Sequence, residues 1–535
     1  MAYSAEKSNG FASIQDYFSA RAALIDAEQQ LGYEGHAKRT ELESAAEKVF
    51  QNQKTSERDN LYGVNKDGSG CEAGHRFLYC LDLLKKSKIA EFAFKAPKGC
   101  LLHCHFDAIL PPDGMLSDAR KQDHLYIKSD VPLIREGFFE HALPQFTVLK
   151  EQVPLTETTN LFQPTYIPGS WMKYSSFLEM FPGGVERAES WLTSLNVIDA
   201  TDAYHSRQTV DGIWQRFIRA VILGRSMLCY ESAYAAHLRR ILWAFARDGV
   251  FYAEIRFAMN YQFVIKSDDG SRDYSHHEIM QLVSDVLKEE IPKIQAAGLV
   301  FYGIKVIYAC MRKATKEAME WCMNTCIELK QAFPDLICGF DLQGQEDAGY
   351  PLRYWLPELL AMREKITALG LDLPFILHAG ETHDHGGETD SNLYDAILLG
   401  TKRIGHGFSI TKHPLLMQLC KERNIAIETC PLSNEILGLN PTTKTHHLPV
   451  LLSNGVPCTI NSDDPGSWSA DVMSHDFYQS MMGSNNMSLL AWRVLAEWSI
   501  EHSCMEAGMK KRVGQEFNEE WIKFCTWILE TKETE

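Results

Sequence analysis

Basic residues are in the minority in this chain of 535 residues. Its 53 lysines and arginines are outnumbered by 70 aspartates and glutamates, which gives a formal net charge of −17 at pH 7. This deficit of positive charge argues against a protein that binds nucleic acid or anionic membranes through charge alone. We therefore expect neither nucleic acid nor a membrane among its partners.

Long apolar stretches are missing as well. No run approaches the roughly 20 apolar residues of a membrane-spanning helix, and the first ten residues are too polar for a secretory signal. The 45% of hydrophobic residues still suffices for a large core and excludes a globally disordered chain. Cysteines such as Cys100 and Cys338 stand in apolar runs, where thiols usually are small buried groups. We expect a globular protein of a reducing compartment, the cytoplasm.

Motifs of several common enzyme classes are absent. The chain has no H-E-x-x-H, no G-x-x-x-x-G-K-[ST] and no pairing of H-x-E with P-C-x-x-C. The first two absences remove the common metalloprotease and phosphate-loop classes. The third removes the zinc deaminases that flip bases out of nucleic acid.

Short apolar or β-rich runs alternate with longer helical patterns from Lys98 onward. Such alternation predicts parallel strands that are joined by crossover helices. The eight runs are 99–106, 249–259, 300–310, 336–342, 374–380, 402–407, 425–430 and 456–461. Eight units predict an α/β protein with a closed (β/α)₈ barrel, a TIM barrel, whose chemistry lies at the carboxyl ends of the strands.

Two segments stand outside the eight repeats. Residues 1–95 have helical patterns with polar breaks, and we expect an N-terminal helical accessory region, or arm, ahead of a barrel domain at 96–535. About 140 residues separate the first two strands, more than a βαβ unit needs, so we expect an insertion at about 111–205. Because it leaves the rim after the first strand, it is either a lid over the active site or a surface excursion.

The first strand ends in an H-x-H-x-D motif formed by His103, His105 and Asp107. Side chains alternate along a strand, so these three share one face while Leu102 and Cys104 take the other. Two imidazoles on one inward face suit a transition metal, usually zinc. Alone the motif is weak, because a hydrogen-bonded pair of core histidines has the same pattern.

Polar residues at the ends of three other strands strengthen the metal hypothesis. His378 ends the fifth strand, His406 the sixth and Asp463 the eighth, and a barrel brings such rim segments together. The set of His103, His105, His378 and Asp463 offers three nitrogens and one carboxylate oxygen, with a position left for water.

Neighbouring residues suit acid–base and substrate-binding roles. Glu381 lies three residues beyond His378, off the strand, where it can be an acid or base without being a ligand. His406 lies between two glycines, which leave room for close approach. Asp464 cannot share a face with Asp463 in extended chain, so it is free to contact substrate. These placements describe a zinc-activated water that attacks an electrophilic carbon.

The ordered set of motifs resembles a known family. H-x-H-x-D, D-L-x-G-x-E at 341–346, H-A-G-E at 378–381, G-H-G at 405–407 and S-D-D-P at 462–465 are similar to motifs of the adenosine and AMP deaminases of the metal-dependent hydrolase superfamily. The arm, the insertion and the lead-in A-P-K-G-C-L-L-H at 96–103 resemble the adenosine deaminase-related growth factor subfamily. Members of that subfamily are commonly secreted dimers. The resemblance therefore adds a homodimer and an extracellular location as alternatives.

The resemblance implies a cofactor and the residues that act with it. One Zn²⁺ per subunit would be bound by His103, His105, His378 and Asp463. The implied catalytic residues are Glu381, His406 and Asp463. Glu381 would donate a proton to purine N1, while His406 would orient the attacking water and help to deprotonate it.

The resemblance also implies the substrate, a small purine nucleoside. Adenosine, and 2′-deoxyadenosine with it, would be hydrolysed at purine C6 to inosine and ammonia. The implied substrate contacts are Asp464 at purine N7, the backbone N–H of Gly344 at N3 and Asp107 near the 5′ hydroxyl of the sugar.

Two alternatives stay open. An AMP-specific site must hold a phosphate dianion, which Asp107 would repel, although Lys121, Lys128 and Arg135 of the insertion offer positive charge. A deaminase of AMP or of another adenine derivative is therefore the first alternative. The second is a non-catalytic binding or growth-factor-like protein that uses the arm and the insertion as interaction surfaces.

Overall fold

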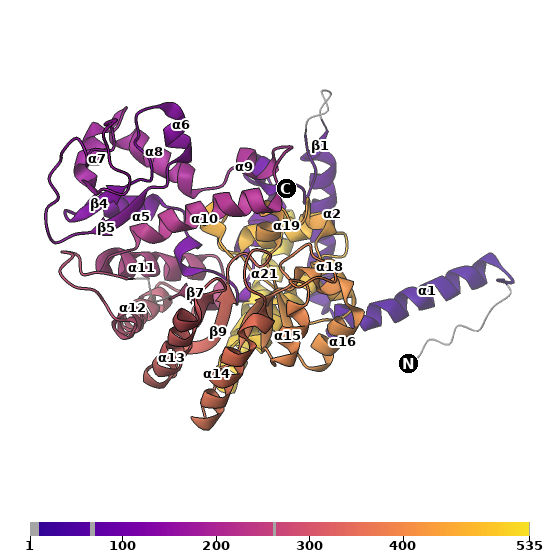
Figure 1. Ribbon diagram of the computed structural model, residues 1–535. Helices are drawn as coiled ribbons and strands as arrows, with labels where there is room; N and C mark the ends of the chain where they lie inside the picture. Colours follow the sequence, from indigo (N-terminus) through magenta and orange to yellow (C-terminus); the bar gives the residue numbers. More distant parts are fainter. Residues whose placement is uncertain (1–9, 65–69, 260–263, 534–535) are drawn as a thin grey trace.

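A barrel of parallel strands forms the centre of the protein in the computed structural model, which describes residues 10–64, 70–259 and 264–533 (Figure 1). The barrel strands are β3 (Gly99–Leu101), β7 (Val250–Ala258), β8 (Ile304–Met311), β9 (Ile337–Gln343), β10 (Ile376–Ala379), β11 (Arg403–His406), β12 (Ala426–Thr429) and β13 (Cys458–Ile460). Each strand lies in one of the eight runs expected from the sequence or overlaps it by all but one residue. The predicted (β/α)₈ architecture is confirmed.

The barrel closes by joining two sheets of four strands. One sheet has the order β3-β7-β8-β9 and the other β10-β11-β12-β13, with parallel pairing throughout. Isolated parallel bridges join them at both seams, Phe340 with Phe375 and Cys104 with Asp463. The second seam therefore brings the H-x-H segment beside the residues that follow the last strand.

Helices connect the strands and cover the outside of the barrel (Figure 1). They are α11 (Glu231–Arg247), α12 (His276–Ala296), α13 (Lys316–Ala332), α14 (Leu356–Ala368), α15 (Asn392–Leu398), α16 (Pro414–Glu422), α17 (Pro431–Ile436), α18 (Leu448–Ser453), α19 (Ser474–Gly483) and α20 (Leu489–His502). Some of their starts follow local rules. For example, α12 begins with a capping box in which Ser275 and Glu278 satisfy each other's backbone N–H groups.

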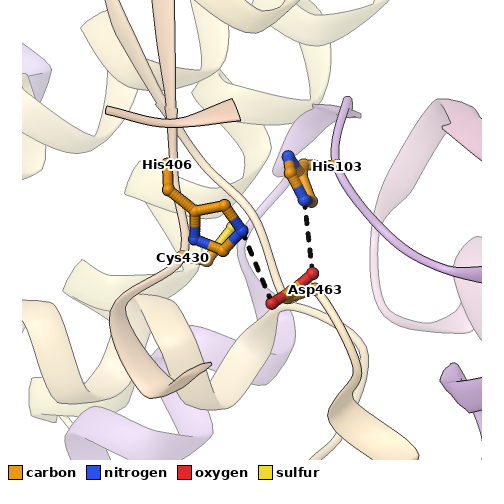
Figure 2. Close-up of side chains that lie close together, drawn as sticks. All are labelled: His103, His406, Cys430 and Asp463. Atoms are coloured by element: carbon orange, nitrogen blue, oxygen red, sulfur yellow. Dashed lines mark ion pairs between the residues drawn. The ribbon is translucent and has the colours of Figure 1, made fainter. Parts of the chain in front are cut away.

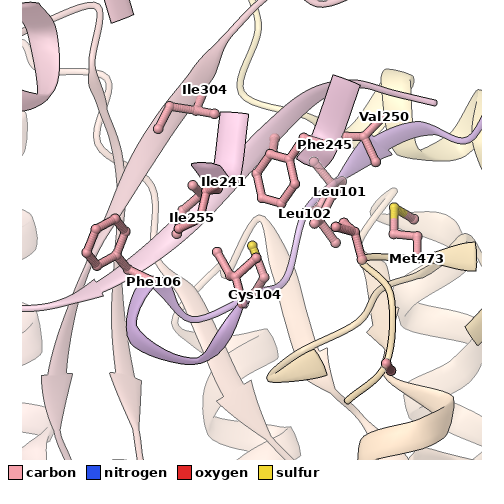
Figure 3. Close-up of a cluster of buried hydrophobic side chains, with 14 of the residues drawn as sticks. Leu101, Leu102, Cys104, Phe106, Ile241, Phe245, Val250, Ile255, Ile304 and Met473 are labelled. Carbon is pink, nitrogen blue, oxygen red and sulfur yellow. The ribbon is translucent and has the colours of Figure 1, made fainter. Parts of the chain in front are cut away.

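One layer of the core lies between the first two strands and α11 (Figure 3). Leu102, Cys104 and Phe106 are buried in the same cluster as Ile241 and Phe245 of α11. Burial of each large side chain contributes about 1.5–3 kcal/mol. The alternation predicted for residues 102–105 is confirmed, because the apolar side chains join this layer while the histidines between them meet polar groups of other strands.

The N-terminal region is joined to the C-terminal helices. It contains α1 (Ile14–Leu31), α2 (Glu41–Asn60), β1 (Gly63–Val64), β2 (Gly70–Cys71), α3 (Leu81–Leu84) and α4 (Lys88–Lys95). α2 packs along α21 (Ala507–Glu533), and Trp521 Nε1 donates to Glu43 at 2.9 Å. α1 projects from the body and, among the described residues, none of its own is buried (Figure 1). The first nine residues of the expected arm lie outside the described residues.

The expected insertion is a small α/β unit beside the barrel (Figure 1). Its elements are α5 (Asp113–Ala119), β4 (Leu125–Lys128), α6 (Glu136–His141), β5 (Gln145–Val148), β6 (Met172–Lys173), α7 (Tyr174–Met180), α8 (Gly184–Asn196) and α9 (Ala200–Tyr204). The strands form an antiparallel sheet in the order β5-β4-β6. Phe177, Phe181 and Trp191 meet in its own aromatic core, with Phe181 and Trp191 ring centroids 5.5 Å apart. α10 (Val210–Met227) then leads back to the barrel.

Across the described ranges, no helix combines the length and the apolar character that crossing a bilayer requires.

Candidate active site

The H-x-H-x-D segment follows the carboxyl end of β3. The strand ends at Leu101, and residues 106–108 form a 3₁₀ turn, so Asp107 does not share a strand face with the two histidines. The expected strand geometry is wrong at this residue because the chain turns there toward the insertion. Asp107 nevertheless lines the same cavity as His105.

The four expected metal ligands converge at one point. Asp463 Oδ1 lies 3.2 Å from His103 Nε2 and 3.1 Å from His105 Nε2. One ring nitrogen of His378 lies within 4.8 Å of a ring nitrogen of each of these histidines. Despite this proximity, the buried His103 Nε2 and Asp463 Oδ1 have no hydrogen-bond partner among the described residues. A cation between them would satisfy both atoms, so the donor set fits a zinc ion.

Figure 2 shows His103 and His406 on two sides of Asp463, whose two carboxylate oxygens face one histidine each. Cys430 lies in the same group, and sequence reasoning did not single it out. Burial, and next the charge of Asp463, raise the pKa of the Cys430 thiol well above its usual range.

Each metal-site histidine makes a second contact through its other ring nitrogen. The contacts are His103 Nδ1 with Glu428 Oε2 at 2.8 Å, His378 Nδ1 with Asp341 Oδ2 at 2.6 Å, and His105 Nδ1 with Gln343 Oε1 at 3.1 Å. Such partners orient the ring and leave Nε2 for a metal. Sequence reasoning missed Glu428, and it included Asp341 and Gln343 only as part of a motif. The one signal for Glu428 is a lone carboxylate inside an apolar strand.

Two buried arginines link these carboxylates inside the barrel. Arg256 lies 2.7 Å from both Asp341 Oδ2 and Glu428 Oε2. Arg403 lies 2.5 Å from Glu428 Oε1 and 2.6 Å from Glu254 Oε2. Burial opposes ionisation of Glu428, but Arg256 and Arg403 hold the pKa of its carboxyl well below the usual range. Glu428 is therefore a permanent acceptor for His103.

Glu381 and His406 approach Asp463 from neighbouring strand ends. His406 Nε2 lies 3.7 Å from Asp463 Oδ2, and His406 Nδ1 lies 3.5 Å from Glu381 Oε1. Burial, and next the charge of Asp463, raise the pKa of Glu381 well above its usual range. The backbone N–H of Glu381 donates to Glu346 Oε2 at 2.8 Å, which fixes the start of this loop. A neutral, fixed carboxyl group is suited to donating a proton.

The backbone at these residues adopts uncommon conformations. His406 and Asp463 both have φ of 58°, in the left-handed region that side chains other than glycine rarely adopt. Such strain concentrates at functional sites. A Cβ at Gly405 would lie 3.0 Å from His103 Cε1, so only glycine lets β11 come this close. The close approach expected for the glycines beside His406 is confirmed at this position.

A chain of hydrogen bonds fixes the proton positions on His406. The backbone N–H of Leu448 donates to His446 Nδ1, so the proton of the neutral His446 ring is on Nε2. His446 Nε2 then donates to Asn434 Oδ1 at 3.0 Å, and Asn434 Nδ2 donates to His406 Nδ1 at 3.1 Å. His406 therefore presents an Nε2–H group to Asp463. Burial lowers the pKa of His446 well below its usual range, which keeps the chain in this state.

His446 and His447, in the loop that precedes α18, support His406 from outside the strand-end motifs. Both are 3% exposed, and His447 Nε2 donates to the carbonyl oxygen of His406 at 2.9 Å. Their sequence separation from the G-H-G motif gives no sign of these contacts, which arise because the loop before α18 folds over β11.

The candidate substrate residues surround a cavity of about 490 Å³. Its lining includes His105, Asp107, Gly344, His378, Glu381, His406, Asp463 and Asp464. Gly344 has φ of 101°, a conformation that favours glycine. Burial, and next the charge of Asp463, raise the pKa of Asp464 well above its usual range, so its carboxyl group is a hydrogen-bond donor. A volume of this size suits a small organic ligand.

One wall of the cavity is formed by α10, which sequence reasoning did not connect with the site. Trp214, Phe217 and Val221 of this helix line the cavity together with Arg225. Arg225 Nε lies 4.0 Å from Asp107 Oδ2. As far as the described ranges extend, no residue of 111–205 lines the cavity. The residues that line the cavity therefore favour a surface excursion over a lid as the role of the insertion.

Comparison with known proteins settles the family. Residues 196–520, more than half of the chain, match the family model described as adenosine deaminase. The chain belongs to the adenosine deaminase family. The family indicated by the five motifs is thereby confirmed, and the protein is a metal-dependent hydrolytic deaminase.

Named relatives in this family match most of the chain. Adenosine deaminase of Lutzomyia longipalpis is 34% identical over 82% of this chain and 80% of its own length. Adenosine deaminase 2-A of Danio rerio is 29% identical over 83% of this chain and 82% of its own length. These names agree with the expected growth factor-related subfamily.

Solved structures agree on the fold. Adenine deaminase of Arthrobacter aurescens superposes with a TM-score of 0.53 at 19% identity, covering 80% of this chain and all of the other. An amidohydrolase of Burkholderia ambifaria with bound Zn gives 0.53 at 15% identity, covering 88% of this chain and 98% of the other. At this identity the likeness is one of fold.

Proposed function

We propose that this deaminase hydrolyses adenosine, and 2′-deoxyadenosine, to inosine and ammonia. The observation that carries the proposal is the convergence of three histidines and one aspartate beside a buried neutral glutamate at one cavity. Membership of the adenosine deaminase family supports the same reaction. A purely binding, growth-factor-like role is not favoured, because such a role would not need this set of perturbed acid and base groups.

We assign one Zn²⁺ per subunit to His103, His105, His378 and Asp463. The unpaired His103 Nε2 and Asp463 Oδ1 support this donor set, as do the oriented Nδ1 atoms of all three histidines. When bound, zinc is a Lewis acid that makes water a strong nucleophile near neutral pH.

The proton steps are assigned to Glu381, His406 and Asp463. Glu381 is neutral in the free site and donates its proton to purine N1 as the C6 carbon is attacked. His406 orients the attacking water through its Nε2–H group. Because that nitrogen already carries a proton, His406 assists deprotonation by compensating negative charge on the water oxygen. Asp463 Oδ2, which lies 3.7 Å from His406 Nε2, is the carboxylate oxygen assigned to accept the proton that the water loses.

The purine and sugar contacts are assigned to three cavity residues. The neutral carboxyl group of Asp464 can donate to purine N7, which only accepts hydrogen bonds. The backbone N–H of Gly344 is assigned to N3. Asp107 is assigned to the 5′ hydroxyl, with Arg225 beside its carboxylate.

A nucleoside is favoured over AMP. A 5′ phosphate would meet the Asp107 carboxylate at the sugar end of the cavity. The three basic residues of the insertion that could have compensated contact other insertion residues instead. These contacts are Lys121 with Asp118 at 3.9 Å, Lys128 with the Trp171 ring at 4.7 Å and Arg135 with the Phe138 ring at 4.2 Å.

We further propose a homodimer in which α1 contributes to the interface, with residues 1–95 as the accessory region and 96–535 as the barrel domain. Phe18 and Leu24 of α1 are 56% and 51% exposed, an unusual share for large apolar side chains of a projecting helix. For the compartment we propose the cytoplasm, with the extracellular space as the alternative. The 14 cysteines, all within the described ranges, are free thiols, which supports a reducing environment.

Ammonia release tests the assignment. The zinc-loaded protein is given adenosine, 2′-deoxyadenosine, AMP and adenine side by side, and Glu381→Gln should lose at least about 100-fold in kcat on adenosine. The matched control is Glu290→Gln, which changes a carboxylate that is 5% exposed on α12, outside the cavity lining. A folded, zinc-loaded protein that turns over none of the four compounds would refute the adenosine assignment, and a preference for AMP would refute the reading of Asp107.

A further inference from the structure

Two thiols lie close together toward the amino-terminal end of the barrel, away from the metal-site residues. Cys338 is the second residue of β9, and Cys504 follows α20 and precedes α21. Cys338 is buried with Ile307 and Ile376, and Cys504 packs against this group. The two sulfur atoms and a carboxylate oxygen of Glu254 all lie within 4.8 Å of one another.

A bulge in β9 accounts for the position of Cys338. The pairing of β8 with β9 shifts so that the consecutive residues Val306 and Ile307 pair with Ile337 and Gly339. Cys338 is the extra residue, and bulges re-aim the side chain that they leave unpaired. The pair of thiols is therefore a product of strand geometry and not of proximity in the sequence.

The surroundings of the two thiols do not suit a metal ion. Arg403 Nη2 lies 2.6 Å from Glu254 Oε2, and Arg403 Nη1 lies 3.7 Å from Cys504 Sγ. Arg403 already pairs with the Glu254 carboxylate that a metal cation would need as a ligand. The positive charge of the guanidinium group also repels a cation. The same positive charge favours a thiolate at Cys504.

The two thiols differ in access and in acidity. Of the 14 cysteines only Cys71 and Cys504 are partly exposed, whereas Cys338 is buried. The pKa of the Cys504 thiol lies below its usual range. The main cause is a hydrogen bond from Cys338, and burial, the next cause, acts in the opposite direction. Burial raises the pKa of Cys338 well above its usual range. A partly exposed cysteine with a lowered pKa beside a buried cysteine is the arrangement of an attacking and a resolving thiol.

We propose that Cys338 and Cys504 form a reversible disulfide by reaction with a low-molecular-weight disulfide such as glutathione disulfide. The Cys504 thiolate attacks one sulfur of glutathione disulfide, which forms a mixed disulfide and releases one glutathione thiolate. Cys338 gives its proton to the released glutathione thiolate and attacks the Cys504 sulfur, which releases the second glutathione thiolate; this thiolate takes up the proton that Cys504 had lost to solvent. Two protein thiols are oxidised, and one glutathione disulfide is reduced to two glutathione molecules. The inference does not depend on the substrate proposed above.

Disulfide mapping of the full-length, zinc-loaded protein tests this proposal. The protein is incubated with glutathione disulfide, denatured with N-ethylmaleimide and digested without reductant, and its peptides are identified by mass spectrometry. We expect the joined peptides of Cys338 and Cys504 to become the main species of both cysteines. Dithiothreitol given before the N-ethylmaleimide step should restore both as alkylated thiols.

Two variants separate this pair from general thiol oxidation. Cys71→Ser removes the other partly exposed thiol and should leave the joined peptides unchanged. Cys504→Ser should leave Cys338 unoxidised, so that it is recovered as an alkylated thiol, because the buried sulfur then has no entry point. If a variant does not fold, disulfide mapping of the unsubstituted chain still tests the proposal. A glutathione adduct that persists on Cys504 beside a free Cys338, or alkylation of both while Cys71 is oxidised, would overturn the proposal.

Discussion

Glu428→Gln is the most informative single change outside the cavity. Glu428 does not line the cavity, yet its two carboxylate oxygens contact His103, Arg256 and Arg403 at 2.5–2.8 Å. Glutamine has nearly the same shape but keeps only one acceptor oxygen and turns an NH₂ group toward a guanidinium or imidazole N–H. The substitution therefore tests whether the outer carboxylate, rather than the bulk of the side chain, holds His103, the proposed metal ligand.

The size of the effect can be worked from the contacts. Removal of one partner from a buried ion pair costs about 3–5 kcal/mol of stability. Arg256 keeps Asp341 at 2.7 Å and Arg403 keeps Glu254 at 2.6 Å, so we expect the lower end of that range. Loss of the outer partner of a metal ligand typically costs about 10–100-fold in metal affinity, and we expect zinc affinity to fall within that interval.

Competition with a chelator measures the zinc affinity, and urea unfolding of the metal-free protein measures the stability. Glu290→Gln serves as the matched control, because Glu290 is also buried and paired but belongs to α12. At saturating zinc we expect kcat of Glu428→Gln to recover to within about threefold, since Glu428 does not touch the cavity. A folded variant whose zinc affinity stays within about twofold of the unsubstituted protein would refute the reasoning.

Three further predictions concern the cavity wall, the proton position on His406 and the stability at different pH. Arg225→Ala removes the cation 4.0 Å from Asp107, so KM for adenosine should rise about tenfold while kcat changes little; steady-state kinetics check this, and an unchanged KM would contradict it. Asn434→Ala removes the donor to His406 Nδ1 and should lower kcat about tenfold or more and shift the pH–rate profile, with Asn434→Gln expected to restore part of the rate. Burial raises the pKa of Glu435 to about 7, from about 4.5 in the unfolded chain. The protonated side chain therefore contributes its full stabilisation below pH 4.5, and this contribution is lost as the pH rises through about 7. Glu435→Gln should therefore gain roughly 1–3 kcal/mol relative to the unsubstituted protein between pH 5 and pH 8, as measured by urea unfolding, and parallel pH curves would disprove this.

The strands and motifs were predictable because they depend on local patterns. Each barrel strand is a short apolar run between breakers, and the rim chemistry follows from the end of each run. The prediction failed at Asp107, where the strand ends early and the chain turns toward the insertion. The strand-end motifs also gave no sign of His446 and His447, whose side chains support His406. Local patterning cannot report a contact that one loop makes by folding over another strand.

The sequence by itself determined the barrel, the order of its strands and the candidate metal and acid–base residues, because these are properties of short segments and of their order along the chain. Only the tertiary structure decided which side chains support them. Glu428 orients His103 across 325 residues of chain, α10 supplies the cavity wall, and Cys338 meets Cys504. These contacts exist because barrel closure brings distant strands within a few ångströms, and no local pattern encodes that distance.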